Sequence, residues 1–98
     1  MKRDEVIATL RAHERELKDL GVLRVAVFGS VARGDDRGDS DVDLVVAFDE
    51  GQRHSLVDVA RVHRTLSTLL RAEVDLAVEP LQTARFRAHV EQDLVRAF

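Results

Sequence analysis

Apolar side chains recur at helical spacing in three segments of the chain, at about residues 3–20, 55–71 and 82–98. In each segment charged and polar residues fill the positions between them, as on an amphipathic helix. The apolar positions are Val6, Ile7, Leu10, Leu17 and Leu20, then Leu56, Val59, Ala60, Leu66 and Leu70, and finally Phe86, Val90, Leu94 and Phe98. Gly21 follows the first stripe and Ser55 precedes the second, where a helix stop and an N-cap are expected. The pattern predicts three helices.

Three shorter segments have strand character, at residues 23–28, 41–48 and 73–78. Side chains alternate between the two faces of a strand, so Asp41 and Asp43 share one face of the second strand, opposite a row of apolar residues. Asp75 lies opposite the apolar row of the third strand in the same way. Residues 31–40 contain two glycines and several turn formers, which predicts at most one helical turn and then a loop. The order of elements predicts one α/β domain over residues 1–98, a small sheet covered by helices.

Composition narrows the classes of function. The 98 residues include no cysteine and four histidines, which excludes disulfides, thiolate nucleophiles and cysteine-based metal sites. The chain has no run of 18 apolar residues and no basic-then-apolar leader, so we expect a cytoplasmic protein without a membrane span. A net charge of −3 gives no general attraction for nucleic acid. Any bound metal is expected to be a hard cation on oxygen ligands.

The acidic residues of the second and third strands form the first candidate site. Cα atoms two residues apart on a strand lie about 6.6 Å apart, so Asp41 and Asp43 project together. Asp75 joins them if its strand pairs beside theirs. Two unit charges about 4 Å apart repel by roughly 4 kcal/mol at an effective dielectric of about 20, so the cluster calls for a cation or a shifted pKa. A pair of Mg²⁺ ions would relieve the repulsion and suit phosphoryl-type transfer.

The second candidate feature is Gly29-Ser30, at the end of the first predicted strand. A glycine lets backbone N–H groups approach a phosphate, and the Ser30 hydroxyl can donate a hydrogen bond to it. A short helix beginning there would add a favourable dipole. Because the acidic run repels a free triphosphate and attracts one that carries magnesium, the two features together predict a metal–nucleotide substrate.

Gly29-Ser30, ten further residues and Asp41-Val42-Asp43 match the GSx10DxD signature of minimal nucleotidyltransferases of the DNA polymerase beta superfamily. The stretch VFGSVARGDDRGDSDVDLVV also resembles the fuller family pattern, and the likeness covers nearly the whole chain. It implies the nucleotidyltransferase fold, with a small mixed sheet flanked by helices.

Carried over residue by residue, the resemblance implies that Gly29 and Ser30 hold the β- and γ-phosphates. Asp41 and Asp43 would bind both magnesium ions. Asp75 would bind the catalytic ion and help to activate the incoming hydroxyl. Arg33 occupies the arginine of the family pattern and is assigned to nucleotide binding, although the sequence leaves open whether it reaches a phosphate or a structural carboxylate.

Domains this short resemble the MNT antitoxins, which are usually encoded beside a HEPN-domain ribonuclease toxin. The resemblance implies transfer of AMP from ATP to a tyrosine of the toxin, which silences it. Two alternatives stay open, a non-catalytic antitoxin that neutralises its partner by binding, and a nucleotidyltransferase for a small molecule such as an aminoglycoside.

Other motifs are interpreted without function. Asp39, Asp41 and Asp43 imitate a calcium-binding EF-hand loop, but Leu44 stands where that loop needs glycine. Arg33-Gly34-Asp35 is interpreted as a turn, and Asp35 and Asp39 as loop and cap residues. His13, His54, His63 and His89 lack metal-ligand spacing and are assigned no role. The apolar stripe from Phe86 to Phe98 is interpreted as core, with a docking surface as the alternative.

Overall fold

The computed structural model describes residues 1–35, 41–51 and 54–98. The elements, in chain order, are α1 (Arg3–Ala12), α2 (Glu14–Asp19), β1 (Val22–Phe28), α3 (Gly29–Arg33), β2 (Val42–Phe48), α4 (Leu56–Leu70), β3 (Val74–Val78), α5 (Ala84–Asp93) and β4 (Val95–Arg96). The strands form one sheet in the order β3-β2-β1-β4. β1 is antiparallel to β2 and β4, whereas β2 and β3 are parallel. The predicted small mixed sheet flanked by helices is confirmed.

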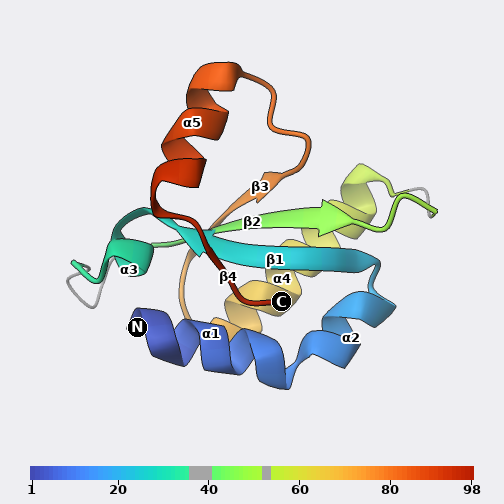
Figure 1. The fold of residues 1–98 in the computed structure, drawn as a ribbon. Coiled ribbons are helices and arrows are strands. Elements are labelled where there is room, and N and C mark those ends of the chain that lie inside the picture. The colour runs from blue at the N-terminus through green and yellow to red at the C-terminus, as the bar shows by residue number, and fades with distance from the viewer. Residues whose placement is uncertain (36–40, 52–53) are drawn as a thin grey trace.

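Helices cover the two faces of the sheet unequally. α1, α2 and α4 lie against one face, and α5 crosses the other face alone (Figure 1). The larger core lies under the three helices and includes the predicted apolar row of β2, which is Val42, Leu44, Val46 and Phe48. The smaller core lies under α5 and consists of Ala26, Phe28, Val45 and Val90. Asp43 alternates with the larger core's residues, so its side chain belongs to the face that α5 covers.

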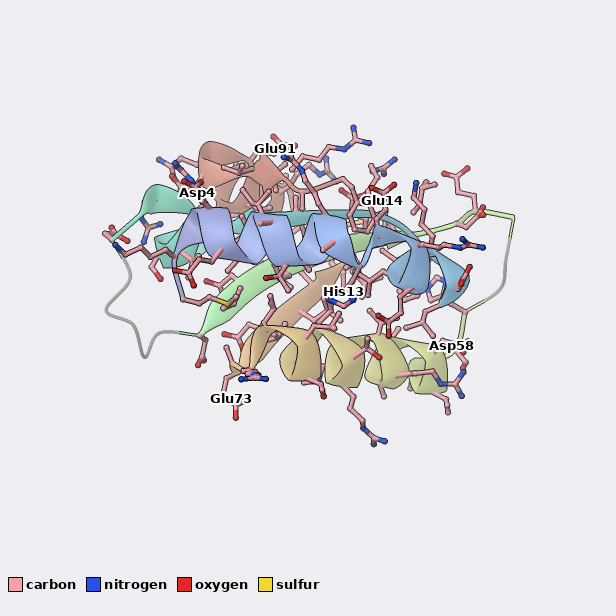
Figure 2. The ribbon with its side chains drawn as sticks, turned by 90° about the horizontal axis from the view of Figure 1, so that it is seen from below. Asp4, His13, Glu14, Asp58, Glu73 and Glu91 are labelled. Carbon is pink, nitrogen blue, oxygen red and sulfur yellow. The ribbon has the colours of Figure 1, made fainter. Side chains whose placement is uncertain are left out.

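The first predicted helix is two helices. The backbone of His13 leaves the helical region (φ −111°, ψ 20°) and separates α1 from α2. Figure 2 shows His13 at this junction, with α1 and α2 running alongside α4. Leu10 and Leu17, on either side of the break, are both fully buried. The sequence holds neither glycine nor proline here, so its pattern gave no signal of the break.

The second predicted helix is confirmed as α4, with Ser55 as its N-cap. The Ser55 hydroxyl accepts from the Asp58 N–H, and the Asp58 carboxylate accepts from the Ser55 N–H in return. Asp58 and Glu73 mark the two ends of this region in Figure 2. The predicted apolar stripe was partly wrong, because Leu56 is 87% exposed and Ala60 is also exposed. The buried row is Val62, Leu66 and Leu70, and at 100° per residue Leu56 and Ala60 lie to one side of it.

The last predicted helix was wrong beyond Asp93. Leu94 is extended (φ −62°, ψ 127°), and the chain then forms β4 beside β1. The Ala97 N–H donates to the Val25 carbonyl at 2.9 Å, so the end of the chain satisfies backbone groups that β1 would otherwise leave unpaired. Leu94 is half exposed and Phe98 packs against the larger core. The continuous helical stripe from Phe86 to Phe98 therefore does not exist.

Pro80 ends β3 as predicted, since the strand stops at Val78. The expected turn begins as α3, and the interpretation of Asp39 as a loop or cap residue falls outside the described residues. Among the helices that the structure describes, none is long and apolar enough to cross a membrane.

Candidate active site

Strand register brings two of the predicted carboxylates together. In the parallel pair β2 and β3, Asp43 is the direct partner of Asp75, and the Asp75 carboxylate is close enough to act on the pKa of Asp43. Asp41 precedes β2 and is exposed, yet its charge acts on Asp43. The expectation that the strands of Asp43 and Asp75 pair is confirmed.

The same register places the glycine of the motif against Asp43. Phe28, at the end of β1, is the partner of Asp43 on the other side of β2, and Gly29 follows it as the first residue of α3. Gly29 has φ +75°, which L side chains rarely adopt, and a Cβ there would overlap Asp43 Oδ2 and lie 3.1 Å from its Cγ. Only glycine therefore allows the strand-to-helix turn to lie this close to the carboxylate. Ser30, in the first turn of α3, is half buried.

Asp43 is the electrostatic centre of the site. Burial raises the pKa of Asp43 above its usual value, and the nearby Asp75 carboxylate and the charge of Asp41 raise it further. The charge of His89, on α5, acts in the opposite direction. A half-buried carboxylate beside two others is a position that a bound cation would stabilise.

The donor set fits magnesium, because it consists of carboxylate oxygens, the ligands that hard dications prefer. The arrangement is nevertheless incomplete as a coordination sphere. Within residues 1–35, 41–51 and 54–98, no three His, Asp or Glu side chains are gathered so that they would hold one metal ion. Asp43 and Asp75 form the close pair, and Asp41 stands beside it at the start of β2.

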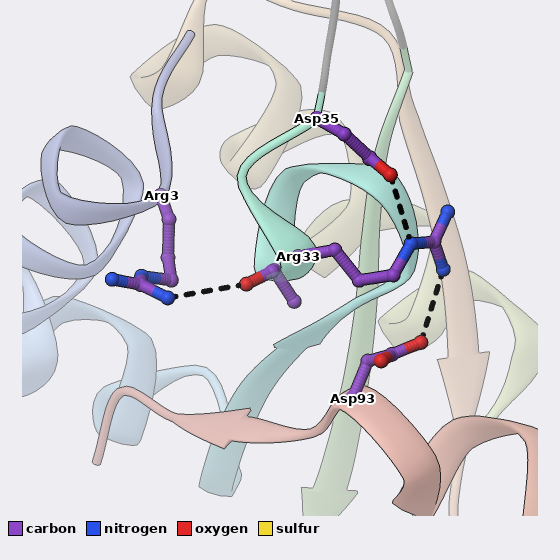
Figure 3. A network of polar contacts seen from close by, with 5 residues as sticks. Arg3, Arg33, Asp35 and Asp93 are labelled. Carbon is purple, nitrogen blue, oxygen red and sulfur yellow. Dashed lines mark hydrogen bonds and ion pairs between the residues drawn. The ribbon is translucent and has the colours of Figure 1, made fainter.

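The Arg33 side chain donates hydrogen bonds to two carboxylates. Its Nε donates to Asp35 Oδ2 at 3.2 Å and its Nη1 to Asp93 Oδ2 at 3.0 Å (Figure 3). The hydrogen bond with Asp93, followed by that with Asp35, raises the pKa of Arg33. Arg3 Nη1 donates to the Ala32 carbonyl at 3.3 Å and so ties α1 to α3. The Arg33 side chain links α3 to the end of α5, and its assignment to nucleotide binding stays a prediction.

Sequence reasoning missed the contribution of α5. Because this helix packs on the face that carries Asp43, it brings His89 within electrostatic range of that carboxylate. It also brings Phe86 edge-on to Phe28, with ring centroids 6.2 Å apart. Positions 86, 89 and 90 share one helical face, and Val90 on that face is buried. The apolar Val90 was thus the sequence feature that could have indicated that Phe86 and His89 face the sheet.

Comparison with known proteins agrees with this geometry. Residues 10–97 match the family described as "Nucleotidyltransferase domain". The chain belongs to the nucleotidyltransferase domain family. The resemblance inferred from the GSx10DxD motif is thereby confirmed, and with it the assignment of the chain as a nucleotidyltransferase.

Two relatives are named for protein adenylylation. Protein adenylyltransferase MntA of Thermococcus cleftensis is 39% identical over 77 residues, which cover 78% of this nucleotidyltransferase and 76% of that protein. A Methanocaldococcus jannaschii protein named "Putative protein adenylyltransferase" is 33% identical over 93 residues, or 93% of each chain.

Solved structures share the fold. A structure described as a "putative minimal nucleotidyltransferase" is 40% identical, with a TM-score of 0.78 over 97% of this chain and 95% of that one. A structure of a tri-AMPylated Shewanella oneidensis HEPN toxin in complex with an MNT antitoxin is 15% identical. It has a TM-score of 0.65 over 94% of this chain and 71% of that one, a likeness of fold alone.

Proposed function

We propose that this nucleotidyltransferase is a magnesium-dependent protein adenylyltransferase that transfers AMP from ATP to a tyrosine hydroxyl of a HEPN-domain ribonuclease toxin, and so acts as its antitoxin. The observation that carries the proposal is the placement of Asp43 between Gly29 and Asp75 across three adjacent strands or strand ends. If Gly29 belongs to a phosphate cradle, Asp43 binds metal and Asp75 accepts the proton, the three groups lie in the order that the reaction needs, which supports the proposal. The two relatives named as protein adenylyltransferases support the choice of AMP and of a protein acceptor.

We assign each of these residues a role in the proposed reaction. The backbone N–H groups at Gly29 and the Ser30 hydroxyl bind the β- and γ-phosphates. Asp41 and Asp43 would hold two Mg²⁺ ions, and Asp75 would share the catalytic one. When bound, these ions neutralise charge that develops on the phosphoryl oxygens and lower the carboxylate repulsion around Asp43.

The proposed reaction is an in-line displacement at the α-phosphorus. The phenolic oxygen of the acceptor forms a bond to that phosphorus, and the bond from phosphorus to the α,β-bridging oxygen breaks. Pyrophosphate leaves with the bonding electrons. The phenolic proton passes to the Asp75 carboxylate and then to solvent, so the net products are AMP-tyrosine, pyrophosphate and one proton.

A protein acceptor suits the layout of residues 1–98. The site and its supporting elements occupy most of residues 1–98, which we propose form a single catalytic domain acting in the cytoplasm. Orientation of an acceptor contributes about 7 to 11 kcal/mol of barrier lowering. A macromolecular partner supplies that orientation through its own contacts, and a toxin in complex with an MNT antitoxin of the same fold is an example.

The test is the mass of the partner. The HEPN-domain protein encoded beside this chain is incubated with it, ATP and Mg²⁺, and is then analysed by intact mass spectrometry and by an RNase assay. We expect the toxin to gain one or more AMP units and to lose its RNase activity together. If an Asp41→Asn, Asp43→Asn double variant neutralises the toxin fully with no gain in mass, neutralisation is by binding and the proposal is wrong. Adenylylation of an aminoglycoside with none of the toxin would contradict it equally.

A further inference from the structure

If the proposed function holds, the order of the strands determines from which side an acceptor can reach the α-phosphorus of ATP. Gly29 and Ser30 follow β1, Asp43 lies on β2, and Asp75 lies on β3, which is an edge of the four-stranded sheet. In an in-line displacement the attacking oxygen stands opposite the leaving group. With the β- and γ-phosphates at the end of β1, the attacking oxygen stands on the side of Asp75 and approaches across the β3 edge.

A cavity of about 490 Å³ lies along this edge, beginning one residue after Asp75. Its walls come from Leu76 to Val78 of β3, from the segment after Pro80, and from Phe86 on α5. Asp75 and Ala77 share one face of β3, and Ala77 packs against the smaller core beneath α5. The Asp75 carboxylate and the cavity are therefore on the same face of the sheet.

The walls of the cavity suit a planar aromatic ring. Phe86 is 38% exposed, and its edge-on contact with Phe28 fixes the position of its ring. Ala77 is small, Leu81 adds apolar surface, and Gln82 supplies an amide at the rim. Aromatic pairs gain about 0.5 to 1.5 kcal/mol beyond the burial of their area, so an aromatic guest is favoured over an aliphatic one of equal size.

We infer that this cavity is the acceptor pocket, in which the ring of the target tyrosine packs against Phe86 and presents its hydroxyl to Asp75. Neither the motif nor the charge pattern of the chain assigns these residues a role in the reaction. The pocket supplies selectivity for a phenol over the aliphatic hydroxyls of serine and threonine.

A second cavity, of about 670 Å³, flanks the same edge on the side of α4 and gives the rival location. It is lined by His63, Arg64 and Ser67 and also touches Asp75. Asp75 alternates with Val74 and Leu76, which pack in the larger core beneath α4, so its side chain lies on the other face, with Ala77 and α5. An acceptor in the α4 cavity would approach the wrong face of β3.

Nuclear magnetic resonance locates the acceptor without requiring transfer. The ¹⁵N-labelled protein is saturated with Mg²⁺ and α,β-methylene-ATP, which cannot donate AMP, and is titrated with N-acetyl-tyrosinamide. We expect the amide signals of Ala77, Gln82 and Phe86 to shift, and to shift less with N-acetyl-leucinamide. The inference is overturned if the shifts appear at His63 and Arg64, if leucinamide has an equal effect, or if the nucleotide alone moves these signals and tyrosinamide adds nothing.

Kinetics with the toxin give an independent readout. Phe86→Leu keeps apolar packing on Phe28 and removes the ring, so the KM for the toxin should rise about two- to tenfold, with the KM for ATP unchanged. Val57→Ala, on an exposed position of α4, is the matched control and should leave both constants unaltered. Equal effects of Phe86→Leu on the two KM values would contradict an acceptor pocket. If tyrosinamide occupies the cavity but the toxin is never modified, the proposed partner is wrong and the pocket stands.

Discussion

Gly29 is the residue at which local backbone geometry and the chemistry of the site depend on each other. Its positive φ starts α3 directly after β1, and its missing side chain leaves room for the Asp43 carboxylate. Gly34 also has a positive φ, of +80°, but a Cβ added there would meet no atom within 4 Å. A side chain at Gly34 would therefore meet only the strain of the positive φ, whereas one at Gly29 would meet that strain and the clash with Asp43.

Gly29→Ala is expected to destabilise the protein more than Gly34→Ala. Both substitutions place alanine in the left-handed region, which costs about 1 to 2 kcal/mol, and only the first also displaces Asp43. Urea unfolding of the two variants measures the difference, and α,β-methylene-ATP binding should fall for Gly29→Ala alone. Equal losses of stability would show that Asp43 does not constrain this position.

Asp43→Asn is expected to abolish transfer and to stabilise the metal-free protein in a pH-dependent way. The pKa of Asp43 is raised in the folded state, so above its ordinary value of 3.8 the native protein holds more protons than the unfolded chain. The free energy of unfolding of wild type therefore falls as pH rises toward the folded-state pKa, and the variant lacks this loss. Chemical unfolding of both proteins without metal between pH 4 and 8 should show an advantage for the variant that grows and then levels off.

A pH-independent difference between the two proteins would contradict this assignment of the pKa of Asp43. Asp58 cannot account for the expected pH dependence, because this residue is the same in both proteins. In addition, the hydrogen bonds from Ser55 lower the pKa of Asp58. The stability that Asp58 contributes is lost as pH falls, whereas the destabilisation by Asp43 grows as pH rises.

At the residue scale, strand alternation predicted that Asp43 and Asp75 lie opposite the apolar rows of their strands, so that they can meet if the strands are neighbours. Alternation alone does not say which strands pair, so the contact depended on the parallel register of β2 and β3. The effect of His89 on Asp43 could not be predicted in the same way. It depends on which face of the sheet α5 covers, and local spacing carries no information about that choice.

At the scale of elements, the Arg33 ion pairs attach α3 to the end of α5. The Arg33 guanidinium lies 3.0 Å from Asp93, whose side chain is 18% exposed, and 3.2 Å from the more exposed Asp35. In a double-mutant cycle of Arg33→Ala and Asp93→Ala, unfolding free energies should show a small favourable coupling that weakens as salt is added. The corresponding cycle with Asp35→Ala is expected to give a smaller coupling, and additive effects in both would mean that the contacts do not join the helices.

The nucleotide-binding assignment of Arg33 is tested with the same variants. Direct contact with a phosphate predicts that Arg33→Ala weakens binding of α,β-methylene-ATP while Asp93→Ala does not. Equal weakening in both would indicate that Arg33 acts by holding α3 and α5 together.

The N-terminus of α4 depends on the reciprocal hydrogen bonds of Ser55 and Asp58. Ser55→Ala should lower the free energy of unfolding by about 1 kcal/mol, the typical cost of losing a serine N-cap. Thr68→Ala, on an exposed position of the same helix, is the control and is expected to have little effect in the same urea titration. A Ser55→Ala variant as stable as wild type would contradict the role of the cap.

Helices and strands were predictable where periodicity and capping residues agreed, as in α4, β2 and β3. The last helix was overextended because Phe86, Val90, Leu94 and Phe98 happen to be four residues apart, although only the first two belong to α5. The helix ends where the chain turns to pair with the edge of β1. That pairing is a tertiary contact, and the local sequence does not indicate it. A strand of two residues, such as β4, is also too short to show alternation.

At the scale of the whole molecule, the unequal covering of the sheet determines where chemistry can occur. Three helices cover one face, whereas α5 alone crosses the other (Figure 1). Asp43 lies on the face beneath α5, and Asp75, on the edge strand, is exposed. The proposed phosphate site at the end of β1, the carboxylates on β2 and β3, and the proposed acceptor pocket beyond β3 follow one line across the sheet. We propose that the groups along this line together carry out adenylyl transfer.

Label transfer from ATP tests that claim most directly. The HEPN-domain partner is incubated with Mg²⁺, the wild-type protein or Asp43→Asn, and ATP labelled at either the α- or the γ-phosphorus. Adenylyl transfer through Asp43 requires label in the partner from the α-position only, and none with Asp43→Asn. Label from the γ-position, or undiminished α-label with Asp43→Asn, would contradict it.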